Sequence, residues 1–114
     1  MKLILLPLMI ASSLLAENVA FWEIQKVKAN DTLNIRSLAT YKSEKISSIP
    51  HNEKCVINHG CGKNISLEAM MDLQEDEIQI FLDQAKEDWC YVEYKGKKAW
   101  AKKHYLKASS STCK

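Results

Sequence analysis

The chain has 114 residues, 46% of them hydrophobic and 26% charged, and a formal net charge of +2 at pH 7. This length allows one small domain whose hydrophobic core is marginal without additional cross-links. The nearly balanced charge argues against a basic nucleic-acid-binding surface and against an acidic tail.

Residues 3–15 form an apolar run that follows a single basic residue, Lys2. A membrane-spanning helix needs about 20 apolar residues, whereas a shorter run that ends in a small residue is typical of a secretory signal. We therefore expect a signal peptide of residues 1–16 and a mature domain of residues 17–114.

Cleavage after Ala20 and retention of the segment as an N-terminal anchor remain alternatives. The mature chain would keep fifteen basic and all fourteen acidic residues, which gives a net charge near +1. After removal of the signal we expect no stable membrane span, and a periplasmic or secreted location.

The first half of the mature chain contains short runs that alternate between apolar and polar residues, a pattern that predicts half-buried strands. Pro50 ends one of these runs, because proline cannot donate a hydrogen bond to a sheet. The predicted strands are residues 21–28, 33–36, 46–49 and 55–58. The pairs expected to share one face are Trp22 with Ile24, Leu33 with Ile35, and Cys55 with Ile57.

The periodicity becomes helical between residues 62 and 88, where four apolar residues follow the spacing i, i+3, i+4, i+7. They are Ile78, Phe81, Leu82 and Ala85. Asp72 and Glu75 resemble a capping box for this helix, and Ser66 is a suitable cap for a shorter turn at residues 67–71. We interpret residues 64–87 as an insertion between two strands that are neighbours in space.

The apolar stripe of this insertion needs a surface to cover. Burial against the sheet is the favoured interpretation, because a stripe at this spacing is usually part of a core. The alternative is a partner-binding surface formed by Met70, Met71, Ile78 and Phe81, since methionine-rich surfaces adapt to partners.

Residues 89–101 predict a β-hairpin, because two aromatic-rich runs flank a Lys-Gly-Lys-Lys tip. Cys90, Val92 and Tyr94 are expected to face the core, and Trp89 and Tyr91 the opposite side. Residues 102–106 should form one helical turn that leads to a last strand. We expect Cys113 to tie down the serine-rich tail, residues 108–114.

The four cysteines predict two disulfides, since an even count in a short exported chain is typical of cross-linking. We favour Cys61 with Cys90, which pins both ends of the insertion, and Cys55 with Cys113. Cys55 with Cys90 is the main competing pair. A zinc site that combines three of these cysteines with His59 is less favoured, because the spacing contains no C-x-x-C.

The sequence contains no visible Ser/His/Asp arrangement, carboxylate pair or glycine-rich phosphate loop, so we expect no catalysis, cofactor or metal. The three histidines lie near turns and are expected in solvent; they are His51, His59 and His104. A local basic patch beside Trp100 is interpreted as a solvated hairpin tip rather than a nucleic-acid site. Its lysines are Lys95, Lys97, Lys98, Lys102 and Lys103.

Five short motifs occur in the order found in bacterial SH3 (SH3b) domains, and from residue 33 to residue 106 the chain resembles that family. The motifs are Leu33-Asn34-Ile35-Arg36-Ser37, Ile46-Ser47-Ser48-Ile49-Pro50, Trp89-Cys90-Tyr91-Val92-Glu93-Tyr94, Gly96-Lys97-Lys98-Ala99-Trp100 and Tyr105-Leu106. The chain departs from the family where residues 37–40 lack glycine and proline, and where Ala99 replaces a glycine.

The resemblance implies a mostly β fold, namely a small SH3-like five-stranded barrel with an α-helical insertion, here stapled by disulfides. It also implies a ligand groove flanked by Trp89 and Tyr105, which Tyr41 is placed to join and beside which Tyr91 lies. The implied function is a non-enzymatic binding module for a cell-wall peptide or an envelope protein. An accessory subunit that docks on a larger periplasmic partner through the inserted helix is the alternative, as is a purely structural role for Trp89 and Tyr105.

Overall fold

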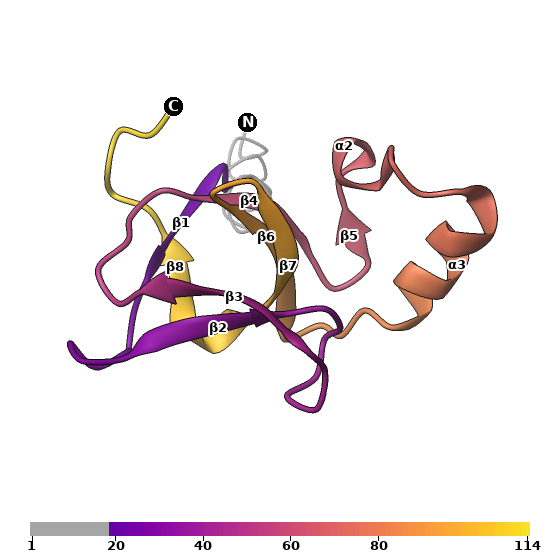
Figure 1. Cartoon of the computed structure of the whole chain (residues 1–114). Coiled ribbons are helices and arrows are strands. Elements are labelled where there is room, and N and C mark those ends of the chain that lie inside the picture. The colour runs from indigo at the N-terminus through magenta and orange to yellow at the C-terminus, as the bar shows by residue number, and fades with distance from the viewer. Residues whose placement is uncertain (1–18) are drawn as a thin grey trace, which may run out of the picture.

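The computed structural model describes residues 19–114, so the predicted signal peptide lies outside the described residues. The chain is built on an antiparallel sheet, with two helices inserted after β5 (Figure 1). Among the described residues, no helix has the length and apolar character needed to cross a membrane. The elements are β1 (Phe21–Ile24), β2 (Thr32–Arg36), β3 (Lys45–Pro50), β4 (Val56–Cys61), β5 (Asn64–Ile65), α2 (Leu67–Met70), α3 (Glu75–Asp83), β6 (Trp89–Tyr94), β7 (Lys97–Lys102), η3 (Lys103–Tyr105) and β8 (Leu106–Ala108).

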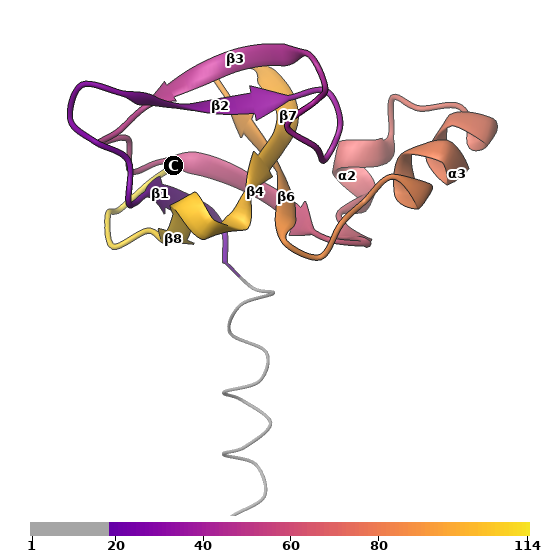
Figure 2. The ribbon, with the colours of Figure 1, turned by 90° about the horizontal axis from the view of Figure 1, so that it is seen from below.

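The sheet has the order β3-β2-β7-β6-β4-β1-β8, and β5 pairs with β4 beside this path. It bends so that the β2–β3 hairpin lies across from β1 and β8 (Figure 2). The mostly β prediction is confirmed, and the sheet is antiparallel; it is open rather than closed into a barrel, because its eight strands end at β3 and β8, and the five-stranded SH3-like arrangement stays a prediction. β2 pairs with β7 at one position only, Arg36 opposite Trp100.

One face of the sheet forms the main core. The alternation in β6 places Cys90 and Val92 there with no exposed surface, as the sequence predicts. Leu33, Ile35, Ile49 and other apolar side chains from the remaining strands pack against them. In β4 the buried apolar residue is Val56, whereas Ile57 is 36% exposed, so the face expected to carry Cys55 and Ile57 is not the core face.

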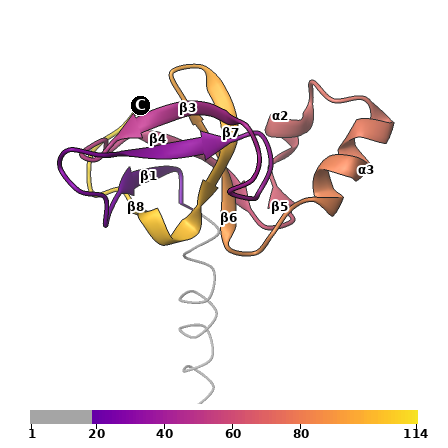
Figure 3. The ribbon, with the colours of Figure 1, turned by 60° about the horizontal axis from the view of Figure 1, so that its bottom comes forward.

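Residues 62–88, which we call the arm, project from one end of the sheet in every view (Figure 3). Ser66 caps α2 by accepting a hydrogen bond from the Ala69 N–H at 3.2 Å, as predicted. The cap of α3 differs from the prediction, because the Gln74 N–H donates to the Glu77 carboxylate at 2.8 Å. Asp72 and Glu75 therefore do not form the capping box.

A second apolar cluster joins the arm to the other face of the β6–β7 hairpin. The Phe81 ring lies 4.9 Å from the ring of Tyr91 and 5.3 Å from that of Trp100. Trp100 is only 1% exposed and lies at the centre of this cluster. Both faces of the hairpin are thus covered, and the stripe of the arm is packed on the sheet at Phe81 and Leu82.

Two disulfides close the fold, and they are the pairs that the sequence analysis favours. Cys61 and Cys90 lie opposite each other in the β4–β6 register, and the Gly62 N–H donates to the Trp89 carbonyl beside them. The neck of the arm is therefore fixed both covalently and by a backbone hydrogen bond.

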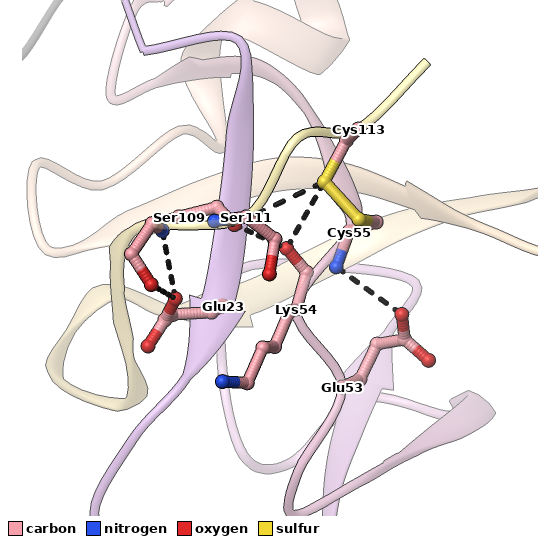
Figure 4. The surroundings of a disulfide bond; sticks show 8 residues. Glu23, Glu53, Lys54, Cys55, Ser109, Ser111 and Cys113 are labelled. Carbon is pink, nitrogen blue, oxygen red and sulfur yellow. Dashed lines mark hydrogen bonds between the residues drawn. A yellow bond between two sulfur atoms is a disulfide. The ribbon is translucent and has the colours of Figure 1, made fainter.

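The second disulfide, Cys55 with Cys113, fastens the serine-rich tail (Figure 4). The Glu23 carboxylate, only 8% exposed, accepts hydrogen bonds from the Ser110 N–H at 2.9 Å and from its hydroxyl at 3.0 Å. Lys107 Nζ lies 3.4 Å from the same carboxylate. The tail is held by this buried acid as well as by the bridge.

Candidate functional site

A groove of about 310 Å³ runs along the edge of β2, where this strand separates from β7. Three of the four predicted ligand residues line it, namely Tyr41, Trp89 and Tyr105. They come from three distant segments, the β2–β3 loop, the start of β6 and η3. The volume lies at the lower end of the range for small-molecule and cofactor sites, about 300–1,000 Å³.

The wall of the groove is strongly basic. Four cationic side chains and one carboxylate, Asp31, line it, and one of the four cations, Lys102, is ion-paired with Asp88. Arg36 Cζ lies 5.8 Å from the Tyr41 ring centre, and Lys102 Nζ lies 5.7 Å from that ring and 5.5 Å from the Trp89 ring. Cations over aromatic faces are held by the ring quadrupole. The cationic residues of the wall are Lys26, Lys28, Arg36 and Lys102.

Neighbouring groups shift the pKa values of two side chains in this wall. Partial burial, followed by the nearby Tyr105 phenol, raises the pKa of Tyr41. The ion pair with Asp88 raises the pKa of Lys102 and lowers that of Asp88, so both remain charged near neutral pH. The groove therefore offers the neutral phenol of Tyr41 and the charged ammonium of Lys102.

The fourth predicted ligand residue, Tyr91, does not line this groove. It packs against Phe81 and Trp100 under the arm, and burial raises the pKa of its phenol. Trp89 is only 4% exposed, so it forms the floor of the groove beneath Tyr41, whose ring centre is 5.1 Å away. The alternation in β6 identified both residues, but a periodicity does not reveal which part of the chain covers each of them.

The cationic wall was not predicted from the sequence, because its four residues come from separate turns and strand ends. Lys26 and Lys28 fall in a segment predicted as strand, whereas β1 ends at Ile24 and both lysines belong to the following loop. Lys102 was expected in the basic patch at the hairpin tip, but it lies at the far end of β7 and lines the groove.

His59 differs from its prediction as well, because it is 6% exposed rather than solvated. Its Nε2 lies 2.8 Å from Glu93 Oε1, and its Nδ1 lies 3.5 Å from Ser66 Oγ. This Ser/His/acid cluster was not visible in the sequence. Since Ser66 Oγ also accepts the Ala69 N–H, the cluster links β4, β6 and the cap of α2.

The four cysteines all form disulfides, which leaves none of them as a thiolate for the alternative zinc site with His59. Within residues 19–114 no group of three or more His, Cys, Asp or Glu side chains is arranged to hold a metal ion. Two disulfides are typical of proteins in oxidising, extracytoplasmic compartments.

A scan against protein-family models and a search of curated proteins found no match to this chain.

Proposed function

We propose that this chain is a non-enzymatic binding module of the bacterial SH3 type, located in the periplasm or secreted. Its ligand is a carboxylate-bearing segment of a cell-wall peptide or of an envelope protein. The observation that carries this proposal is the convergence of Tyr41, Trp89 and Tyr105 in a groove with four cations in its wall. Aromatic faces hold the ligand's backbone and apolar groups, while the cations hold its carboxylates.

The arrangement of the elements supports the relationship to SH3b domains. The chain has two hairpins, β2–β3 and β6–β7, followed by a single turn η3 and a short last strand that pairs with the first. Tyr105 belongs to η3 and lines the groove, the position that the resemblance implies for a ligand residue. In this proposal the bent, open sheet and the arm are additions to the SH3b order of two hairpins, a single turn and a short last strand.

Binding can be tested with purified peptidoglycan, using cosedimentation of the oxidised protein. Tyr41→Ala with Tyr105→Ala should reduce the bound fraction at least tenfold, because both rings are lost from the wall. The unaltered chain should bind, and the affinity should fall with added salt because surface charges are screened. Trp89 is unsuitable for this test, since its burial means that truncation damages the fold.

A matched control is Tyr94→Ala, which removes a partly buried tyrosine away from the groove. Soluble stem peptides with free or amidated carboxylates provide the second arm of the experiment. Equal affinity for the two forms, or binding that survives the double tyrosine substitution, would refute the proposed groove.

The second candidate function is an accessory subunit that docks on a larger envelope protein through the arm. Its support is the exposure of Leu67 (80%), Met71 (76%) and Ile80 (57%) on the arm. In this case Met71→Asp with Ile80→Asp should abolish copurification with the partner, while Tyr41→Ala with Tyr105→Ala leaves it intact. Phe81 is excluded from this test because it packs on Tyr91 and Trp100.

A further inference from the structure

The near-neutral net charge conceals two regions of opposite sign. The arm contains eight carboxylates and two lysines, which gives it a net charge of −6. The rest of the described chain contains thirteen Lys or Arg residues and five carboxylates, a net charge of +8. All eight carboxylate residues of the arm are exposed. The arm projects from the end of the sheet (Figure 1), and the two regions meet at its base, where Asp88 pairs with Lys102.

The arm also carries apolar side chains that the described residues, 19–114, leave uncovered. Leu67, Met71 and Ile80 are 80%, 76% and 57% exposed. They lie among acidic residues, with Glu68 and Asp72 beside the first two and Glu77 three residues before Ile80. Exposed apolar side chains with acidic neighbours fit an apolar surface with a basic border.

The groove described above has this complementary character. Its exposed aromatic side chain, Tyr41, is 57% accessible; Arg36 and Lys102 lie over its ring, and Lys26 and Lys28 line the same groove. The arm is fixed to its own sheet through Phe81 and through the disulfide at its neck. The arm is therefore held against the sheet of its own copy, and its exposed side chains are available to another molecule.

We propose that the arm of one copy of this chain binds the groove of a second copy, head to tail. Leu67, Met71 and Ile80 then pack against the aromatic wall, and the carboxylates of the arm face Lys26, Lys28 and Arg36. The inference rests on the proposed function only in using the same groove. Because the contact joins two different surfaces, it forms rings or short chains, and an envelope ligand competes with it.

Sedimentation velocity of the purified chain tests this proposal over a range of protein concentrations. The Debye length falls from about 30 Å at 0.01 M salt to about 3 Å at 1 M. We expect the mean mass to rise with concentration at the low salt and to return to that of the monomer at the high salt. A chain that stays monomeric at every concentration in low salt overturns the proposal.

Two variants assign the surfaces. Met71→Lys with Ile80→Lys disables the arm, and Lys26→Glu with Lys28→Glu disables the groove; each variant alone should be monomeric. Mixed in equal amounts they should form a one-to-one complex, because one supplies an intact groove and the other an intact arm. Absence of the mixed complex overturns the head-to-tail contact, even if a larger envelope protein binds the arm.

The control variant is Lys95→Glu with Lys97→Glu at the hairpin tip. It makes the same change in net charge as the Lys26→Glu with Lys28→Glu variant, but outside the groove. Each variant also replaces one lysine with a positive φ, which is 51° at Lys95 and 59° at Lys26. It should associate as the unaltered chain does, and its loss of association would refute the assigned surface. The two proposals fail separately, since self-association without peptidoglycan binding refutes the function alone, and peptidoglycan binding by a permanent monomer refutes this inference alone.

Discussion

At the scale of single residues, Gly60 shows how tightly the neck of the arm is built. Its φ is +119°, and an added Cβ would lie 1.9 Å from the carbonyl oxygen of Asn64. Gly96 in the β6–β7 turn also has a positive φ, +81°, but an added Cβ there would meet nothing within 4 Å. A side chain at Gly96 would therefore introduce backbone strain alone, whereas a side chain at Gly60 would introduce both backbone strain and steric overlap.

We predict that Gly60→Ala lowers the free energy of unfolding by about 3 kcal/mol or more, because the β4–β5 turn must open. Gly96→Ala should cost only about 1–2 kcal/mol, the penalty for a left-handed residue. Chemical denaturation of both variants measures the difference. Equal losses would show that the close approach to Asn64 carries no energetic weight.

Glu23 provides a pH-dependent contribution to stability. The hydrogen bond from the Ser110 backbone N–H, followed by those from its hydroxyl and from Lys107, holds the pKa of Glu23 below its ordinary value of 4.5. A lowered folded-state pKa stabilises the fold above the unfolded value, and this contribution is lost as the pH falls through the folded pKa.

We therefore predict that the melting temperature of the unaltered chain falls more steeply below pH 4.5 than that of Glu23→Gln. Thermal melts followed by circular dichroism between neutral pH and pH 2 measure this. Glu44→Gln, an exposed loop carboxylate, serves as the control and should preserve the steep fall. Parallel curves for Glu23→Gln and the unaltered chain would contradict the prediction.

At the scale of the element, α3 depends on a narrow contact. None of its residues is fully buried, and it is held through Phe81 and Leu82 against the hairpin. Its amide groups are expected to exchange with solvent faster than those of the sheet, because few apolar contacts oppose local opening.

Phe81→Ala should reduce the protection of the α3 amides about tenfold or more, since loss of a half-buried ring costs about 2 kcal/mol. Ile80→Ala, which removes an exposed side chain from the same turn, should change protection less than threefold. Hydrogen exchange followed by mass spectrometry resolves both effects. Similar loss in the two variants would mean that Phe81 does not anchor the helix.

The helix and the hairpin show what local sequence patterns predict and what they omit. The spacing of Phe81 and Leu82 predicts an amphipathic helix, and the alternation of Cys90 and Val92 predicts a core face; the structure has both. The pattern does not identify what covers Tyr91, because that depends on how segments distant in the sequence meet. Trp100 was missed as the centre of the second cluster for the same reason.

At the scale of the whole molecule, the groove lies where β2 and β7 diverge, since these strands pair only at Arg36 and Trp100. The sheet stays open because its end strands, β3 and β8, do not pair with each other. The resemblance implied Tyr41, Trp89 and Tyr105 in one site, and the groove contains all three. The cationic wall was not predicted, because Lys28 and Lys102 are 74 residues apart and only the bend of the sheet brings them together.

Global stability depends on the two disulfides, whose sequence separations are 58 for Cys55 with Cys113 and 29 for Cys61 with Cys90. Chain entropy alone gives about 4 kcal/mol for the first and about 3.5 kcal/mol for the second. Cys90 has no exposed surface, so its truncation also leaves a cavity in the core. We therefore predict that Cys61→Ala with Cys90→Ala is the more destabilising double substitution.

Urea denaturation of the two double variants tests this order. The free energy of unfolding should fall by about 4 kcal/mol or more for Cys61→Ala with Cys90→Ala, a large share of the 5–15 kcal/mol of a typical domain. A larger loss for Cys55→Ala with Cys113→Ala would show that the tail contributes more than the neck.

The placement of the bridges also determines how the molecule withstands cleavage. Cys55 and Cys61 precede the arm in the chain, whereas Cys90 and Cys113 follow it. A protease that cuts the peptide backbone in the exposed arm therefore leaves two halves that remain joined by two covalent links. On electrophoresis the nicked molecule should migrate as one band without reductant and as two bands after reduction. Proteases can therefore cut the arm while the segments that form the groove stay covalently joined.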